Sequence, residues 1–194
     1  NNKRAIHFVF LGGARFPYRP DLALKLMGKL IDHGYDCNVD FINKGDHEII
    51  EKAKELTNIP DDKINIISFR HSEIPKILGN YDCGLVMVET SYWRRVCSPT
   101  KMGEYLAGGL PVISLKGINS IDELAERTDC IETISPEDLE DDFNVDKAKR
   151  IISLIKSTKL EKKCKNLAKD EFNLEIAGNL YVQLYNEIQQ LILR

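Results

Sequence analysis

The stretch "AIHFVFL", residues 5–11, is a near-continuous apolar run that contains aromatic and β-branched side chains. Such a run is typical of a central strand in a parallel sheet, because helices cover both faces of that strand. A loop rich in glycine and proline, "GGARFPYRP", follows it. Asp21 can then cap a helix whose apolar residues recur at helical spacing until Gly34. The segment predicts the first strand–loop–helix unit of an α/β fold.

The same alternation continues down the chain. Further strands are predicted from apolar or alternating runs at residues 37–42, 64–69, 83–88, 111–115 and 130–135. Helices are predicted between them at residues 47–56, 72–78, 99–107 and 120–127. Regular alternation indicates a Rossmann-like, doubly wound parallel sheet of about six strands with right-handed crossovers.

The sequence reads as a single domain, 1–194, without an internal repeat or a linker. The sheet and its crossover helices occupy about residues 5–135, and a helical tail occupies about residues 146–194. The last helix of the tail carries one apolar stripe, made of Ala177, Leu180, Leu184, Ile188 and Leu191.

The composition is that of an ordinary soluble globular protein, with 43% of the 194 residues hydrophobic and 29% charged. The net charge of −3 gives no sign of a nucleic-acid surface. No stretch approaches the ~20 apolar residues that span a bilayer, and no signal peptide is evident. The chain begins without methionine and almost directly in a strand, which suggests an excised fragment.

Five cysteines stand at positions 37, 83, 97, 130 and 164, an odd number without CxxC spacing. Cys83 lies inside the apolar run "CGLVMV", where a buried thiol fits well. The pattern favours reduced cysteines and a cytoplasmic location over a disulfide framework or a zinc site.

The stretch "SPTKMGEYLAGGLPVIS", residues 98–114, carries the chemistry. Ser98 is a good N-cap, and Pro99 suits the first helical position. The free N–H groups of Thr100 and Lys101 then form an anion site, which the helix dipole strengthens. The ammonium of Lys101 adds a full positive charge in the same turn. This assembly suits a phosphate.

Glu104 follows one helical turn later, where it can accept hydrogen bonds from the two hydroxyls of a ribose. A phosphate site beside a diol site indicates a nucleotide. The alternative is that Lys101 and Glu104 form a solvated i,i+3 pair worth about 0.2–0.5 kcal/mol. Gly108 and Gly109 would then only terminate the helix, as glycines commonly do.

The stretch resembles the donor-site signature of the GT-B glycosyltransferases, most closely the GT4-type retaining family of bacterial surface-polysaccharide enzymes. The family pattern is roughly "SPxKxxEYLAxGxPVI". "FVFLGGARFPYRPDLALKLM" is similar to the first strand and phosphate loop of the family's C-terminal domain, and "INIISFRHSEIPKILGNYDCGLVMV" resembles a later segment of it. The helical tail, with "YVQLYNEI", also fits. The resemblance implies that the chain is one half of a GT-B fold.

The resemblance also implies roles for residues at the helix start. Glu104 would bind the ribose hydroxyls. Ser98, Thr100 and Lys101 would hold the diphosphate of the donor.

Other implied binding residues lie in two earlier loops. Gly13 belongs to the phosphate loop, and Arg15 looks like its basic residue. Arg19 replaces a lysine that the family often has, and both arginines would neutralise phosphate charge. Arg70 and His71 would line the base pocket, mostly through backbone groups.

One position departs from the family pattern. Many GT4-type enzymes carry a second glutamate, eight residues before the ribose-binding one, that contacts the donor sugar. Val96 stands there in this chain, and Glu89 lies too far back to replace it. Residues 93–95, "WRR", form either a lip over the sugar or a plain surface loop.

The resemblance implies a function for the whole enzyme. It would be a retaining hexosyltransferase of polysaccharide biosynthesis that moves a sugar from a nucleotide-sugar donor to a saccharide or lipid-linked acceptor. No cofactor and no metal are expected, since no acidic DxD-type pair ends a strand. The N-terminal acceptor-binding domain is missing, so catalytic residues are expected partly on that domain and the isolated chain is expected to be inactive. Nucleic acid is not an expected partner, and the full-length enzyme can associate peripherally with a membrane.

Two alternatives stay open. One is a domain of a GT-B-type sugar-nucleotide epimerase, and the other is a non-catalytic, flavodoxin-like binding or regulatory domain. A receiver-type regulator would carry an acidic pocket after its first strand, whereas "FLGGARF" is glycine-rich and basic. An NAD domain would carry GxGxxG there, which "GGARFP" does not supply.

Overall fold

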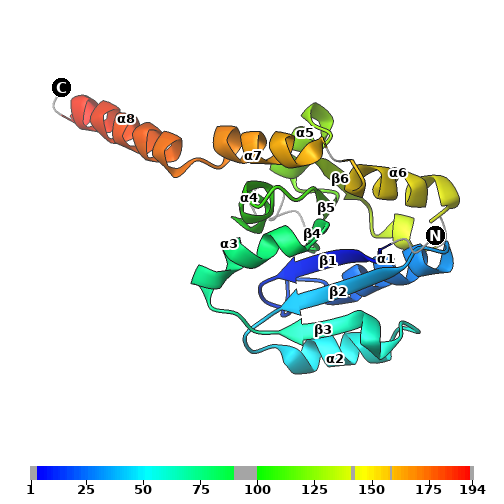
Figure 1. The fold of residues 1–194 in the computed structure, drawn as a ribbon. Coiled ribbons are helices and arrows are strands. Elements are labelled where there is room, and N and C mark those ends of the chain that lie inside the picture. Colours follow the sequence, from blue (N-terminus) through cyan, green and yellow to red (C-terminus); the bar gives the residue numbers. More distant parts are fainter. Residues whose placement is uncertain (1–3, 90–99, 141–142, 158, 193–194) are drawn as a thin grey trace.

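A six-stranded, all-parallel sheet forms the centre of the molecule in the computed structural model, which describes residues 4–89, 100–140, 143–157 and 159–192 (Figure 1). The strands are β1 (Ile6–Leu11), β2 (Cys37–Ile42), β3 (Ile64–Ile67), β4 (Cys83–Val86), β5 (Val112–Leu115) and β6 (Ile131–Ile134). The helices are α1 (Pro20–Asp32), α2 (His47–Glu55), α3 (Ile74–Ile77), α4 (Thr100–Ala107), α5 (Asn119–Arg127), α6 (Val145–Ile155), α7 (Leu160–Glu171) and α8 (Leu174–Ile192). The predicted fold class is confirmed.

The strands follow the spatial order β3-β2-β1-β4-β5-β6. The order reverses between β1 and β4, which makes this the topological switch point of the sheet. β1 pairs with β2 along six residues, but with β4 only through Phe8–Cys83 and Val9–Gly84. Ligands of such sheets bind beyond the carboxyl ends of the strands at the switch point.

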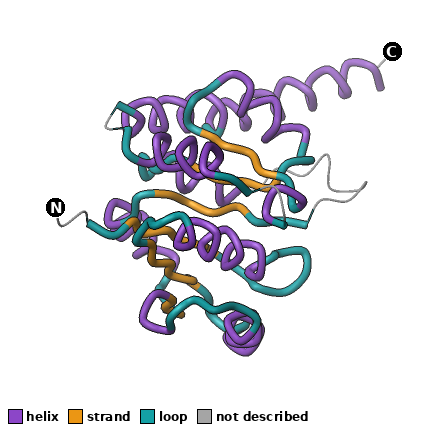
Figure 2. The backbone as a smooth tube through the Cα atoms, turned by 90° about the vertical axis from the view of Figure 1, so that its right-hand side faces the viewer, coloured by secondary structure: helices purple, strands orange, loops and turns teal. Residues whose placement is uncertain are grey.

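Helices cover both faces of the sheet, as Figure 2 shows from the side. Alternate residues of β1 enter different cores: Phe8 and Phe10 pack in one, and Val9 and Leu11 pack in the other. The first core contains buried side chains of α1, α2 and α6, and the second those of α3, α4, α5 and α7. The apolar run of β1 is therefore continuous because each of its faces is buried.

β3 and β4 each end two residues earlier than the sequence predicts, because loop backbones bond to them instead. β3 ends at Ile67, whose carbonyl oxygen accepts from the N–H of Asn43 at 2.9 Å. β4 ends at Val86, and the next carbonyl, of Met87, accepts from the N–H of Arg19 in the first loop.

The predicted cap of α1 is wrong. The helix begins at Pro20, so Asp21 falls inside the first turn and caps nothing. Its carboxylate instead accepts hydrogen bonds from the guanidinium of Arg19. The end of the helix is as predicted, since Gly34 follows it with a φ of +82°. The predicted Ser98 cap of α4 lies outside the described residues.

The helical tail contains α6, α7 and α8, and α8 projects away from the body (Figure 1). Four of its apolar-stripe residues are between 42% and 70% exposed: Leu180, Leu184, Ile188 and Leu191. In the part of the chain that the structure describes, no helix has the length and apolar character needed to cross a membrane. The four cysteines among the described residues are buried and carry free thiols.

Tyr105 fixes α4 over the sheet. It is fully buried, its hydroxyl accepts from the N–H of Leu11 at 2.7 Å, and it donates to the carbonyl of Leu85 at 3.3 Å. Its ring lies directly on Gly84, where a Cβ would come within 2.3 Å of a ring carbon. Burial raises the pKa of the phenol far above its usual value, so the hydroxyl stays protonated.

We expect Tyr105→Phe to lower the free energy of unfolding by about 1–3 kcal/mol, because the buried N–H of Leu11 loses its acceptor. Urea denaturation followed by circular dichroism measures this loss. The control is Tyr181→Phe on α8, where the side chain is 64% exposed and the change should stay within about 0.5 kcal/mol. Equal stabilities of wild type and Tyr105→Phe would show that the hydroxyl does not hold α4 in place.

Candidate functional site

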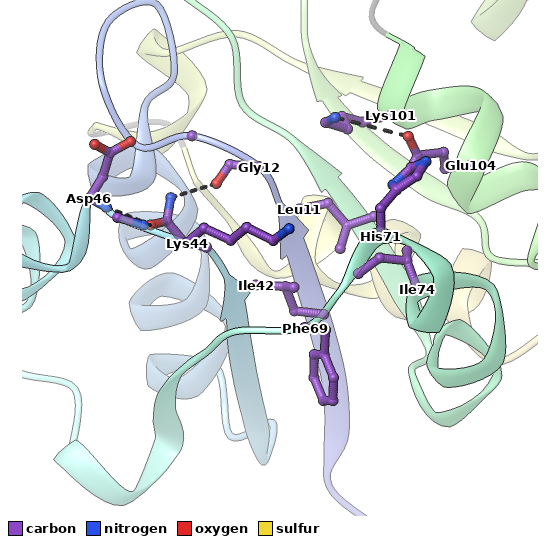
Figure 3. A pocket seen from close by; sticks show the side chains of 13 residues that line it. Leu11, Gly12, Ile42, Lys44, Asp46, Phe69, His71, Ile74, Lys101 and Glu104 are labelled. Atoms are coloured by element: carbon purple, nitrogen blue, oxygen red, sulfur yellow. Dashed lines mark hydrogen bonds and ion pairs between the residues drawn. The ribbon is translucent and has the colours of Figure 1, made fainter.

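A cavity of about 320 Å³ opens at the carboxyl edge of the sheet (Figure 3). Its walls come from the ends of β1 and β2, the loops after β1, β2 and β3, the start of α3, and α4. The lining residues are 11–13, 42–46, Phe69, His71, Ile74, Lys101 and Glu104. This is the place that the topology of the sheet indicates for a ligand.

The first wall brings the backbone of the first loop against Lys101. Gly12 has a φ of +110°, which favours glycine, and a Cβ there would lie 3.1 Å from Cε of Lys101. The glycine thus lets the lysine stem lie across the loop that follows β1. The lysine ammonium and the loop backbone share one side of the cavity.

Glu104 lines the cavity together with Lys101, from the next turn of α4. The carboxylate Oε1 lies 3.9 Å from the ammonium Nζ, and the two side chains are 29% and 32% exposed. The i,i+3 pair that the sequence allowed is therefore present at the outer limit of ion-pair distance. Both groups keep most of their capacity to bind a ligand.

Asp46, in the loop after β2, holds the loop after β1 in place. Its carboxylate accepts from the N–H of Ala14 at 3.0 Å and from Nε of Arg15 at 2.7 Å. These bonds, the Ala14 N–H first, lower the pKa of Asp46. Gly13 lines the cavity, whereas the Arg15 side chain is 77% exposed and lies just outside it.

Asn43 joins the loops after β1, β2 and β3, and the sequence analysis did not identify it. Its buried amide donates to the carbonyl of Gly12 at 2.7 Å and accepts from the N–H groups of Gly45 and Asp46. The main-chain carbonyl of Asn43 accepts a hydrogen bond from the Ser68 hydroxyl at 2.6 Å. The sequence signal was "NKGD" directly after a buried strand, where polar residues lie at the carboxyl edge.

The structure does not bring the other predicted arginines to the cavity wall. Arg19 forms ion pairs with Asp21, at 2.7 Å, and with Glu89, and these carboxylates raise the pKa of its guanidinium. Arg70 is exposed, and its backbone N–H donates to the carboxylate of Glu73 at 2.7 Å.

The three remaining predicted positions differ in where they lie. His71, next to Arg70, lines the cavity. Thr100 is exposed at the first residue of α4. Ser98, like residues 93–95, lies outside the described residues. Among the residues that are described, no three His, Cys, Asp or Glu side chains gather closely enough to hold a metal ion.

No protein-family model matches the chain, and no curated protein is significantly similar to it. Solved structures share its fold at low sequence identity. TarM of S. aureus gives a TM-score of 0.70 at 13% identity over 95% of this chain. The pneumococcal O-GlcNAc transferase GtfA, solved with UDP and GlcNAc, gives 0.58 at 15% identity over 93% of this chain. The C-terminal domain of LpcC, a glycosyl transferase group 1 family protein from Francisella tularensis, gives 0.56 at 16% identity over 87% of this chain.

The chain spans about a third of the length of the larger neighbours. It covers 36% of TarM and 35% of GtfA, but 87% of the LpcC C-terminal domain. These likenesses show the fold alone: a Rossmann-like domain that these glycosyltransferase structures also contain.

The Asp46 bonds predict a pH dependence. Because the folded-state pKa of Asp46 is depressed, its contribution to stability is present above the unfolded value of about 3.9 and is lost as pH falls through the folded value. We expect Asp46→Asn to be less stable than wild type at pH 7, and this difference to shrink as the pH is lowered towards 3. Urea denaturation at both pH values measures it.

The control is Asp170→Asn, an exposed residue of α7. This variant should follow the wild-type pH profile, since the other carboxylates are common to both proteins. A stability gap for Asp46→Asn that stays constant between pH 7 and pH 3 would contradict the ion-pair role of Asp46.

Proposed function

We propose that this chain is the donor-binding domain of a glycosyltransferase, which transfers a hexose from a nucleotide sugar to a saccharide or lipid-linked acceptor. One observation carries the proposal: Lys101 and Glu104, one turn apart on α4, both face a cavity at the carboxyl ends of β1, β2 and β3. The fold shared with GtfA, which was solved with UDP and GlcNAc, supports it.

The chemistry follows from the charges along α4. The ammonium of Lys101, the start of the helix and the backbone of Gly12 favour the diphosphate of the donor. The carboxylate of Glu104 accepts hydrogen bonds from both ribose hydroxyls. As the glycosidic bond breaks, negative charge grows on the departing diphosphate, and Lys101 and the helix dipole stabilise it.

The finer features of the proposal rest on the resemblance of residues 98–114 to the GT4-type signature. The reaction retains the anomeric configuration and uses no bound metal or cofactor. The full-length enzyme acts in polysaccharide biosynthesis in the cytoplasm, in peripheral contact with the membrane that holds lipid-linked acceptors. A second, acceptor-binding domain closes the cleft and supplies part of the catalytic machinery.

We expect Glu104→Ala to weaken binding of the preferred nucleotide by about 5- to 150-fold, which corresponds to about 1–3 kcal/mol for two charge-assisted bonds in a half-open site. Isothermal titration calorimetry with UDP, GDP, ADP and CMP measures it. Glu104→Gln should be milder, and a 2′,3′-dideoxy nucleotide should bind wild type poorly yet lose little more in Glu104→Ala.

The matched control is Glu126→Ala, an exposed glutamate of α5 that lies outside the cavity lining. It should bind nucleotide as wild type does. Equal affinities of wild type and Glu104→Ala would reject the ribose role. Glu104 would then be only the surface partner of Lys101, with a stability contribution below about 0.5 kcal/mol.

We expect the chain alone to bind nucleotide and to transfer no sugar, because one wall of the cleft remains while the acceptor site is absent. Release of UDP from UDP-sugars, measured with a panel of saccharide acceptors, tests this, and titration with UDP in the same buffer shows that the protein is competent to bind. Turnover by the purified chain above the rate of a Lys101→Ala, Glu104→Ala double variant would contradict the prediction.

A further inference from the structure

Lys44 is a cation of the cavity for which the described residues supply no ion-pair partner. It lines the cavity and is exposed, and Figure 3 shows its side chain running across the pocket towards Leu11. Within the described ranges, no hydrogen bond or ion pair engages its ammonium. The nearby carboxylate of Asp46 is instead occupied by Arg15 and the Ala14 N–H.

The order of the strands places Lys44 opposite α4. The loops at this edge follow the order β3-β2-β1-β4, so the loop after β2 lies on the far side of β1 from the helix that follows β4. Lys101 and Lys44 therefore approach the cavity from two different walls. The backbone around Lys44 is held firmly, because Asn43 bonds to the N–H groups on its far side, of Gly45 and Asp46.

Between the two walls the side chains of the lining are apolar apart from that of His71. Leu11, Ile42, Phe69 and Ile74 all contribute to it, from β1, β2, the loop after β3 and α3. A flat aromatic ring suits such a surface, whereas a diphosphate does not. We take a nucleotide with its phosphates at α4 and its ribose at Glu104 to place its base on these side chains, in the same cavity as Lys44.

We propose that Lys44 selects the base of the donor by donating a hydrogen bond to an exocyclic ring oxygen. Uracil presents O4 and guanine presents O6, which are acceptors, whereas cytosine and adenine present an amino group at the same place. An ammonium is a donor only, so it favours the oxo bases and leaves the amino bases facing a like donor. This inference rests on the proposed function, since it takes the phosphates to lie at α4.

The test compares nucleotides that differ at this one group. Titration calorimetry of wild type with UDP against CDP, and with GDP against ADP, should give a preference of about tenfold or more for the oxo member of the pair that binds. In Lys44→Met the preference should fall to about twofold or less, through loss of affinity for the oxo base alone. Lys44→Arg, which keeps a donor, should restore part of it.

Lys52→Met is the matched control, because Lys52 is an exposed lysine of α2 outside the cavity. It should keep the wild-type preference, and unchanged circular dichroism should show that both methionine variants fold. Equal loss of UDP and CDP affinity in Lys44→Met would overturn the inference in favour of a phosphate contact. An unchanged ratio, or a wild-type preference for the amino base, would also overturn it.

The two proposals fail in different ways. If nucleotides bind and Glu104→Ala weakens their binding, but Lys44→Met leaves the base preference unchanged, only the inference about Lys44 is wrong. If no nucleotide binds, or if Glu104→Ala binds as well as wild type, the donor site itself is wrong and the role of Lys44 falls with it.

Discussion

The hydrogen bond from the Leu11 N–H to the Tyr105 hydroxyl connects the sheet to the helix that forms the site. The ladder between β1 and β4 consists of Phe8–Cys83 and Val9–Gly84, and the residues after β4 bond to the first loop instead. The last N–H of β1 therefore needs another acceptor, and the phenol supplies it at the switch point. The same contact fixes the rotation of α4, so that the neighbouring Glu104 faces the cavity.

The motif on α4 divides its work between packing and binding. The ring of Tyr105 packs on Gly84. On another side of the helix, the ring of Phe172 packs on Gly103, where an added Cβ would lie 2.9 Å from a ring carbon. α4 is thus held between the sheet and the end of α7. Of the described residues of the motif, only Lys101 and Glu104 line the cavity. Packing of Tyr105 and Gly103 thus positions Lys101 and Glu104.

The opposite wall depends on the buried residue Asn43 and on Asp46. Asn43 bonds to the loop after β1 and to its own loop, while its carbonyl receives the hydroxyl that follows β3. Asp46 adds the bonds to Ala14 and Arg15. Buried polar groups must be satisfied, and the side-chain amide and main-chain carbonyl of Asn43 together find their partners in three loops, so the geometry of all three is coupled. Lys44 stands between these two anchored residues, with its side chain left for a ligand.

Local pattern in the sequence determined the fold class, the alternation of strands and helices, and the placing of Lys101 and Glu104 on one helix face, because a repeat of 2.0 or 3.6 residues is a property of neighbours in the chain. Strand ends were predicted less well, since loop backbones from elsewhere compete for the same carbonyls. Only the tertiary structure decided that Asn43 and Asp46 build the far wall and that Arg19 pairs with Glu89, 70 residues away, outside the cavity lining. These contacts follow from the strand order β3-β2-β1-β4, which brings together loops far apart in the chain, and no local periodicity encodes that order.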